Sequence, residues 1–174
     1  MTAAHPAPLE LTRHDRDWLT ALGELFFDVV DDGASLGFLA EVGEGEMREY
    51  WEGVFDALGE RQRLWIVHQG GRVLGTVQLS MCSKPNGRHR AEVQKLMVHP
   101  HARRGGIAAR LMAAAEGGAR AQGLSLLVLD TTAQSAAEPF YQSLGWQRVG
   151  EIPHFAANPD GTLAPTALYW KRLD

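Results

Sequence analysis

A basic, glycine-rich turn stands out in the middle of this sequence, where residues 103–106 read Arg-Arg-Gly-Gly. The turn follows an apolar run, Ala91 to Val98, that is typical of a strand, and it precedes a helical pattern that begins at Ile107. A helix start leaves backbone N–H groups unpaired and carries positive potential, so this order of elements can hold phosphate. The two most familiar phosphate motifs are absent, because the sequence contains neither Gly-Lys-Ser/Thr nor G-x-G-x-x-G.

Charge is spread unevenly along the chain. The formal net charge of the 174 residues is -4, which gives no general attraction to nucleic acid or to anionic lipid. The stretch from Lys84 to Arg110 reverses this balance, because it carries seven lysines and arginines against one acid, Glu92. This stretch predicts a site for a small anionic ligand, with a solvated basic face as the alternative.

Length and composition predict one soluble domain spanning residues 1–174. With 45% hydrophobic and 22% charged residues, the chain can form a core, which argues against disorder. A single cysteine, Cys82, excludes an internal disulfide and fits a reducing cytoplasm. His99 and His101 lack an evident third ligand, so we expect no metal site, and no apolar run reaches the length of a membrane span.

Hydrophobic periodicity predicts two helices, an antiparallel hairpin, a strand, a helix, a buried strand, a helix and two final strands, which indicates a mixed α/β fold. The expected helices are Asp15–Val30, Glu44–Leu58, Ile107–Gln122 and Gln134–Leu144, and the expected strands are Leu64–His68, Val73–Leu79, Ala91–Val98, Leu124–Leu129, Trp146–Gly150 and Ala167–Trp170. A glycine pair between the first two strands is typical of a hairpin turn.

Two segments resemble the signatures of the GCN5-related N-acetyltransferases (GNAT). Residues 93–112 resemble the family's acetyl-CoA motif, Arg/Gln-x-x-Gly-x-Gly/Ala after a strand that ends in Val-x-Pro, with Arg103, Gly106 and Ala108 at the specified positions. Residues 137–146 resemble the second signature, an alanine, an aromatic-tyrosine pair and Leu-Gly-aromatic. The resemblance implies a twisted, mostly antiparallel sheet of six to seven strands flanked by about four helices. It places acceptor-side helices at about 14–60 and an acetyl-CoA-binding core at about 64–172.

A closer resemblance, to the tabtoxin-resistance acetyltransferases, covers most of the chain. It rests on residues 32–38, 84–87, 90–98, 148–151 and 159–161. Those enzymes inactivate a β-lactam amino-acid toxin by acetylating its amine. Two positions depart from the wider family: Arg104 stands where glycine is usual, and Gln134 replaces an asparagine common in the cofactor-side loop.

The same resemblance implies a cofactor site built mainly from the main chain. The pyrophosphate of acetyl-CoA is expected on N–H groups from Arg104 to Ala108, the pantetheine arm beside Leu96 to Val98, and the thioester carbonyl on an N–H of Met97 or Val98. The residues expected to bind the cofactor are Leu96, Met97, Val98, Arg103, Arg104, Gly105, Gly106, Ile107, Ala108 and Gln134.

Three side chains are expected to carry the chemistry. In the family, the residue corresponding to Tyr141 hydrogen-bonds the coenzyme A sulfur and is proposed as general acid. Since the pKa of a tyrosine exceeds that of a thiol, hydrogen bonding to the thiolate should matter at least as much as proton transfer. Glu92 and Asp130 lie at strand ends that should face the cofactor, and either could remove the amine proton, directly or through water. The alternatives are a cross-strand partner for Glu92 and a turn cap for Asp130.

The loop between the first two expected helices occupies the place where this family shapes its acceptor cavity. We expect Asp32, Gly33, Ser35 and Phe38 to contact the acceptor, with an ordinary interhelical loop as the alternative. The sequence therefore predicts direct acetyl transfer from acetyl-CoA to the amine of a small molecule, possible acceptors including a β-lactam amino-acid toxin or another amine-bearing antibiotic. Alternatives left open are a catalytically silent acetyl-CoA sensor and acetylation of an amino acid, a polyamine or a protein amine. We expect no nucleic-acid or membrane partner, and a homodimer is left open.

Overall fold

The structure is a computed structural model that describes residues 6–34, 36–37 and 42–174. Its strands are β1 (Leu9–Leu11), β2 (Gln62–Gln69), β3 (Arg72–Met81), β4 (Arg90–Val98), β5 (Leu126–Thr132), β6 (Gln147–Ala157) and β7 (Leu163–Arg172). Its α-helices are α1 (Leu19–Asp31), α2 (Glu44–Ala57), α3 (Ile107–Ala121) and α4 (Ala137–Ser143), and single 3-10 turns lie at Arg16–Trp18, Pro85–Gly87 and Pro100–Ala102.

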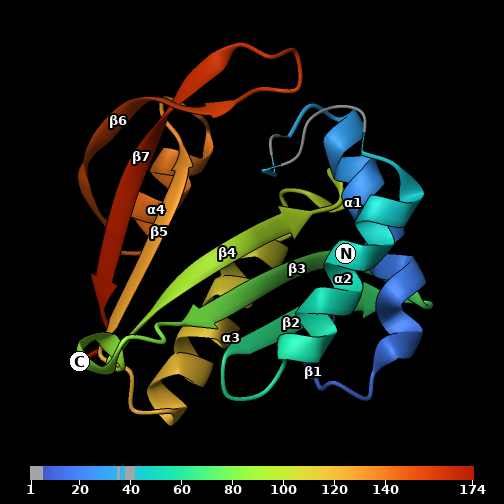
Figure 1. Ribbon diagram of the computed structural model, residues 1–174, viewed down its shortest axis with the longest axis horizontal. Helices are drawn as coiled ribbons and strands as arrows, with labels where there is room; N and C mark the ends of the chain where they lie inside the picture. The colour runs from blue at the N-terminus through green and yellow to red at the C-terminus, as the bar shows by residue number, and fades with distance from the viewer. Residues whose placement is uncertain (1–5, 35, 38–41) are drawn as a thin grey trace.

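The strands form one seven-stranded sheet in the order β1-β2-β3-β4-β5-β7-β6. Among these described strands, β4 and β5 run parallel and every other neighbouring pair runs antiparallel. The predicted mixed α/β fold, with its mostly antiparallel sheet and four helices, is therefore confirmed. Figure 1 shows the sheet opening between β4 and β5, whose upper ends point away from each other.

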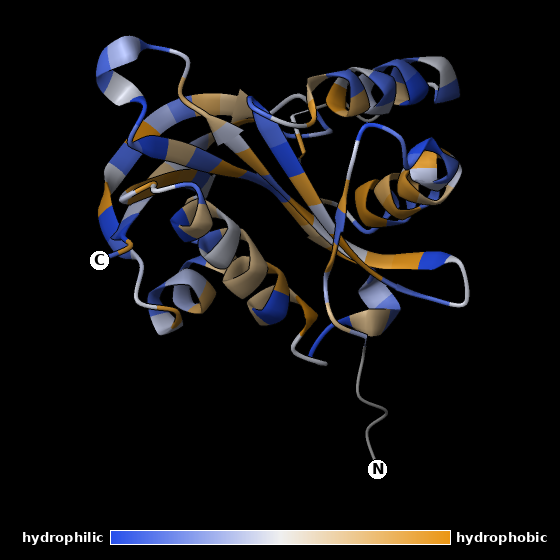
Figure 2. Cartoon of the chain, turned by 90° about the horizontal axis from the view of Figure 1, so that it is seen from below, coloured by the Kyte–Doolittle hydropathy of each residue, from blue (hydrophilic) through white to orange (hydrophobic). Residues whose placement is uncertain are grey.

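The helices cover both faces of the sheet, and Figure 2 shows them on either side of it. Side chains of α1 and α2 form one hydrophobic core with β2. Side chains of α3, together with Tyr141 of α4, form the other core with β3, β4 and β5. Helix α1 buries Leu22, Leu25, Phe26 and Val29, whose spacing is that of one helical face. Burial of each such side chain contributes about 1.5–3 kcal/mol, so this stripe is what fixes the helix on the sheet.

Some elements differ from the sequence-based expectation. Strand β1 was not expected, because three residues are too few to show a period. Strands β6 and β7 are longer than expected, since each contains a proline, Pro153 or Pro165, that reads as a strand end. Pro153 is tolerated because β6 is the edge strand. Helix α4 begins at Ala137 rather than Gln134, because Gln134 has a φ of 60°, outside the helical region.

None of the helices among the described residues combines the length and the apolar character needed to cross a membrane.

Candidate active site

The site begins where β4 and β5 part. Their pairing ends at Glu92, opposite Val128, although both strands continue. Beyond this point β4 carries a bulge: between Gln94 and Met97 it advances three residues while its partner β3 advances two. Lys95, inside the bulge, has a φ of 50°, which a non-glycine residue seldom adopts. The bulge bends β4 away from β5 and leaves an opening in the sheet.

A cavity of about 700 Å³ occupies this opening. That size is ordinary for a small-molecule site. Its walls come from the α1–α2 loop, α2, β4, the end of β5, α4 and the β6–β7 hairpin. The polar and charged side chains that line it belong to Tyr50, Gln62, Gln78, Glu92, Gln94, Lys95, Asp130, Thr131, Thr132, Tyr141, Asn158 and Thr166.

All three residues expected to carry the chemistry line this cavity. Glu92 pairs with Val128, and Asp130 lies two residues further along β5, so both carboxylates lie on the same face of the sheet. Tyr141 comes from α4, in the helix layer on the opposite face, and meets the cavity at the opening between the strands. The fold thus brings together residues that are 49 positions apart in the chain.

Tyr141 is held rigidly and kept protonated. Its side chain is 8% exposed, and its ring lies 6.1 Å from the Tyr169 ring and 6.2 Å from the Trp146 ring. Burial, assisted by the negative charge of Asp130, raises the pKa of Tyr141 to about 12. At neutral pH its hydroxyl is therefore a hydrogen-bond donor to any group in the cavity that develops negative charge.

Lys95 brings a positive charge to the cavity that sequence reasoning missed. Its Nζ donates a hydrogen bond to the backbone carbonyl of Leu36 in the α1–α2 loop and lies 6.0 Å from the Tyr50 ring centre. Burial lowers the pKa of Lys95, whereas the charges of Asp130 and Glu92 oppose that shift. The strand pattern gave no signal for this role, because the bulge that turns Lys95 inward is a tertiary feature.

A chain of amide and hydroxyl groups lies in the cavity on the side of α2 and β3. The Gln62 amide donates to Gln78 Oε1 at 2.6 Å, and the Gln78 amide donates to the Tyr50 hydroxyl at 3.0 Å. Gln78 is only 1% exposed, and in the sequence it stands between the apolar residues Val77 and Leu79, which is the signal that could have identified it. Amides linked in this way give the acceptor side of the cavity a polar surface.

The glycine turn before α3 has the features of an anion cradle. Arg104 and Gly106 both have positive φ angles, 64° and 78°. Within the described part of the chain, the backbone N–H groups of residues 104–109 donate no hydrogen bond. A Cβ on Gly106 would project into open space. Unpaired N–H groups at a helix N-terminus with free access fit a pyrophosphate, as expected for Arg104, Gly105, Gly106, Ile107 and Ala108.

The neighbouring residues expected on the cofactor side take different positions. Leu96 lines the cavity, while Met97 is buried in the α1–α2 core and Val98 packs against the other core. For Met97 and Val98, only the main chain is available for the predicted contacts. Arg103 is half exposed and forms an ion pair with Asp32 at 2.5 Å.

The expected acceptor loop reaches the cavity at other residues. Leu36 and Gly37 line it, whereas Asp32 and Gly33 do not. Asp32 instead connects α1 to the phosphate turn through Arg103. Ser35 and Phe38 lie outside the described residues.

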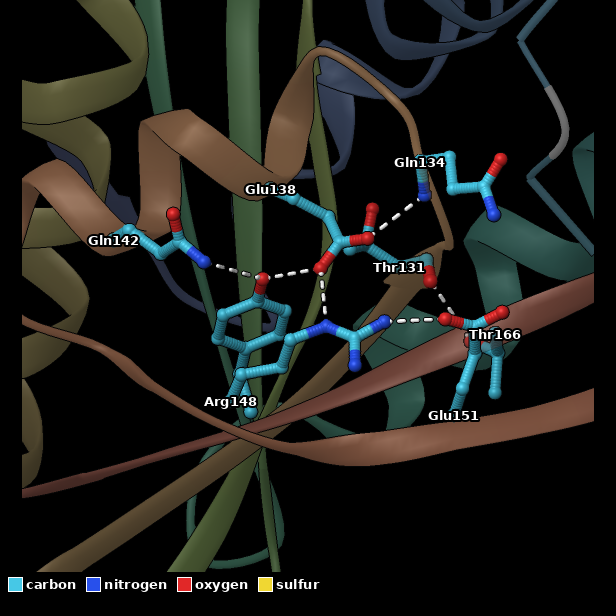
Figure 3. Close-up of polar contacts among 8 residues, drawn as sticks. Thr131, Gln134, Glu138, Gln142, Arg148, Glu151 and Thr166 are labelled. Carbon is cyan, nitrogen blue, oxygen red and sulfur yellow. Dashed lines mark hydrogen bonds and ion pairs between the residues drawn. The ribbon is translucent and has the colours of Figure 1, made fainter.

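A buried carboxylate, Glu138, fixes the base of α4 next to the cavity. Figure 3 shows it between the backbone N–H of Gln134, which donates at 2.7 Å, and the side chain of Arg148, which donates at 2.8 Å. The hydroxyl of Tyr169 also donates to it. These hydrogen bonds lower the pKa of Glu138 to about 2, and the bond from Arg148 has the largest effect. The network sets the αL turn at Gln134 and anchors the helix that carries Tyr141.

Comparisons with known proteins converge on one family. The sequence profile of the Acetyltransferase (GNAT) family matches residues 5–146. An uncharacterized N-acetyltransferase of Azospirillum brasilense, encoded in the hisH-hisA intergenic region, is 33% identical over 145 residues, covering 82% of this chain and 79% of that protein. The Mus musculus protein named "Probable N-acetyltransferase family 8 member 5" is 30% identical over 151 residues; the alignment covers 83% of this chain but only 65% of that relative.

Solved structures share the fold. The structure of yncA from Salmonella typhimurium, solved with its cofactor acetyl-CoA, superposes with a TM-score of 0.77 at 20% identity, covering 97% of this chain and 94% of that one.

Proposed function

Since this chain belongs to the GNAT family of acetyltransferases, we propose that it transfers an acetyl group directly from acetyl-CoA to the amine of a small molecule. The observation that carries this proposal is the joint presence of Glu92, Asp130 and Tyr141 in one cavity. Two carboxylates can bind and deprotonate an ammonium group, and a protonated tyrosine can stabilise a departing thiolate.

The phosphate turn supports acetyl-CoA as the donor. The free N–H groups of residues 104–109 and the open approach to Gly106 fit its pyrophosphate. Acetyl-CoA supplies an activated thioester, and strand β4, which runs from this turn into the cavity, would place the thioester carbonyl near Met97 or Val98. Gln134 has its own N–H engaged by Glu138, so the side chain would make any contact it has with the cofactor.

The cavity supports a small, cationic acceptor. Glu92 and Asp130 bring two negative charges to the cavity against the one positive charge of Lys95, and the balance suits an ammonium group. The amides of Gln62 and Gln78 line the same cavity. An acceptor that carries both an amine and neighbouring polar groups fits this surface. We include amine-bearing antibiotics, among them β-lactam amino-acid toxins, in the proposed class, together with amino acids and polyamines.

A thiol-release assay with acetyl-CoA tests the proposal. The panel should hold amino acids, polyamines, aminoglycosides and toxin-like β-lactams, and we expect release with at least one of them. Replacing Gly106 with tryptophan should abolish acetyl-CoA binding, because the side chain would block the cradle and strain a φ of 78°. Tight acetyl-CoA binding without turnover on any amine would instead indicate a cofactor sensor.

A further inference from the structure

Thr166, on β7, contacts the catalytic carboxylate Asp130. Its hydroxyl oxygen lies 2.8 Å from Asp130 Oδ2 and 2.9 Å from the backbone carbonyl oxygen of Thr131. Thr166 is 3% exposed and lines the cavity. Figure 3 shows its contact with Thr131. A threonine hydroxyl has one hydrogen and can also accept, so it cannot donate to both oxygens at the same time.

This shared hydrogen gives Asp130 a partner in either charge state. When Asp130 is ionised, the Thr166 hydroxyl donates to its carboxylate. When Asp130 is protonated, the carboxyl O–H can donate to the Thr166 oxygen, and the hydroxyl hydrogen can turn to the Thr131 carbonyl. If the proton binds to Oδ1 of Asp130 instead, rotation of the carboxyl group by half a turn brings the O–H next to Thr166. The buried Thr166 hydroxyl therefore keeps a hydrogen-bond partner in both charge states of Asp130.

Glu92 has different surroundings. Among the residues that the structure describes, its carboxylate accepts no hydrogen bond. It lies opposite Ser80 on β3 and Val128 on β5. A carboxylate with free lone pairs can accept hydrogen bonds from an incoming ammonium group, and within the described part of the chain no hydroxyl is hydrogen-bonded to Glu92 as Thr166 is to Asp130.

From these contacts we propose that Asp130 takes the proton from the acceptor amine, that Thr166 is the positioning residue that lets it do so, and that Glu92 binds the ammonium group. This assignment rests on the acetyl transfer proposed above.

The ammonium group gives one proton to Asp130, the neutral nitrogen forms the N–C bond to the acetyl carbon, and the C–S bond breaks with its electron pair passing to sulfur. The second nitrogen proton ends on the sulfur, and the Tyr141 hydroxyl donates a hydrogen bond to the thiolate as it departs. Because the charge of Asp130 contributes to the raised pKa of Tyr141, neutralising Asp130 makes Tyr141 a better donor at that moment.

Four variants of the 174-residue chain test the assignment, using an amine that the thiol-release screen identifies. Thr166→Val removes the hydroxyl and keeps the shape, while Thr166→Ser keeps the hydroxyl and is the matched control. We expect Thr166→Val to lower kcat on the order of tenfold with KM for both substrates nearly unchanged. Thr166→Ser should stay within about threefold of the wild type.

The two carboxylates should separate in the pH profile. Asp130→Asn should lower kcat by about 10²–10⁴ and remove the acidic limb of kcat/KM, as loss of a general base does. Glu92→Gln should raise KM for the amine more than it lowers kcat and should keep the acidic limb. Circular dichroism and thermal unfolding of each variant verify that it folds.

Two results would overturn the assignment while leaving acetyl transfer intact: an acidic limb that survives in Asp130→Asn but disappears in Glu92→Gln, or equal losses of kcat in Thr166→Val and Thr166→Ser. An inactive wild-type protein on every amine would instead overturn the proposed function, and the assignment with it.

Discussion

Two carboxylates eight residues apart, Asp130 and Glu138, have opposite surroundings. Glu138 receives hydrogen bonds from a backbone N–H, a guanidinium and a phenol, which come from the β5–α4 loop, β6 and β7. Asp130 lines the cavity and has one hydroxyl partner, Thr166, that can reverse its role. The pKa of Glu138 falls to about 2, so Glu138 cannot take up a proton near neutral pH.

The contrast shows how this fold separates anchoring from chemistry. Donors that are fixed in direction stabilise one charge state and hold the elements that carry them, whereas a partner that can both donate and accept leaves the charge state free to change. We call the hydrogen-bonded set Gln134, Glu138, Arg148 and Tyr169 the bracket. Substitutions in the bracket should therefore lower the free energy of unfolding. The cavity residues should matter for turnover.

Among variants that compare the cavity with the bracket, the largest effect is expected from Tyr141→Phe, which removes one hydroxyl from the cavity and keeps the buried ring. We expect kcat to fall by about 10²–10³, as it does when a donor to a developing negative charge is lost. The affinity for acetyl-CoA and the melting temperature should stay near the wild-type values. Steady-state kinetics, a binding titration and thermal unfolding measure the three quantities. A drop in melting temperature as large as that of a bracket variant would contradict the separation.

Glu138→Gln should show the reverse pattern. The amide replaces a charged acceptor of three hydrogen bonds, so we expect the free energy of unfolding to fall by about 2–3 kcal/mol. The melting temperature should fall by roughly 4–12 °C, with kcat reduced less than tenfold. Glu151→Gln is the matched control, because Glu151 contacts the same Arg148 at 2.5 Å from an exposed position. An exposed pair contributes about 0–1 kcal/mol, so the control should be nearly neutral.

The bracket also predicts how stability depends on acid. The pKa of Glu138 in the folded protein, about 2, lies below its ordinary value of 4.5. A depressed pKa contributes stability that is complete above the ordinary value and is lost as the pH falls toward the folded value. Urea unfolding of the wild type and of Glu138→Gln should therefore differ clearly at pH 6 and converge between pH 4.5 and pH 2. A constant difference across that range would mean that the Glu138 charge contributes nothing.

The sequence predicts most elements of this fold but few of its contacts. Local patterns were enough for the four helices and for the hairpin of β2 and β3, because periodicity and glycine turns act over short distances. Family signatures located Tyr141 and, through it, the cavity. The roles of Thr166 and Glu138 depend on which strands lie next to each other in the sheet, since β7 enters between β5 and β6. No local pattern encodes that order.

Lys95 is the clearest example of a cavity residue whose position no local sequence pattern encodes. Its replacement has the smallest predicted effect. Strand periodicity treats residues 94–97 as regular, yet the bulge turns the Lys95 ammonium into the cavity, where the charges of Asp130 and Glu92 oppose the lowering of its pKa by burial. A cationic acceptor in the cavity meets this ammonium group as a like charge. Replacing Lys95 with methionine should therefore lower KM for a cationic amine by less than tenfold, because that repulsion is lost. Lys95→Arg, which keeps the charge, should leave KM near its wild-type value. Steady-state kinetics of the three proteins at low ionic strength, where screening is weakest, measure the change. Equal KM values for wild type and Lys95→Met would show that the cation does not act on the acceptor and that its role is confined to the hydrogen bond with Leu36.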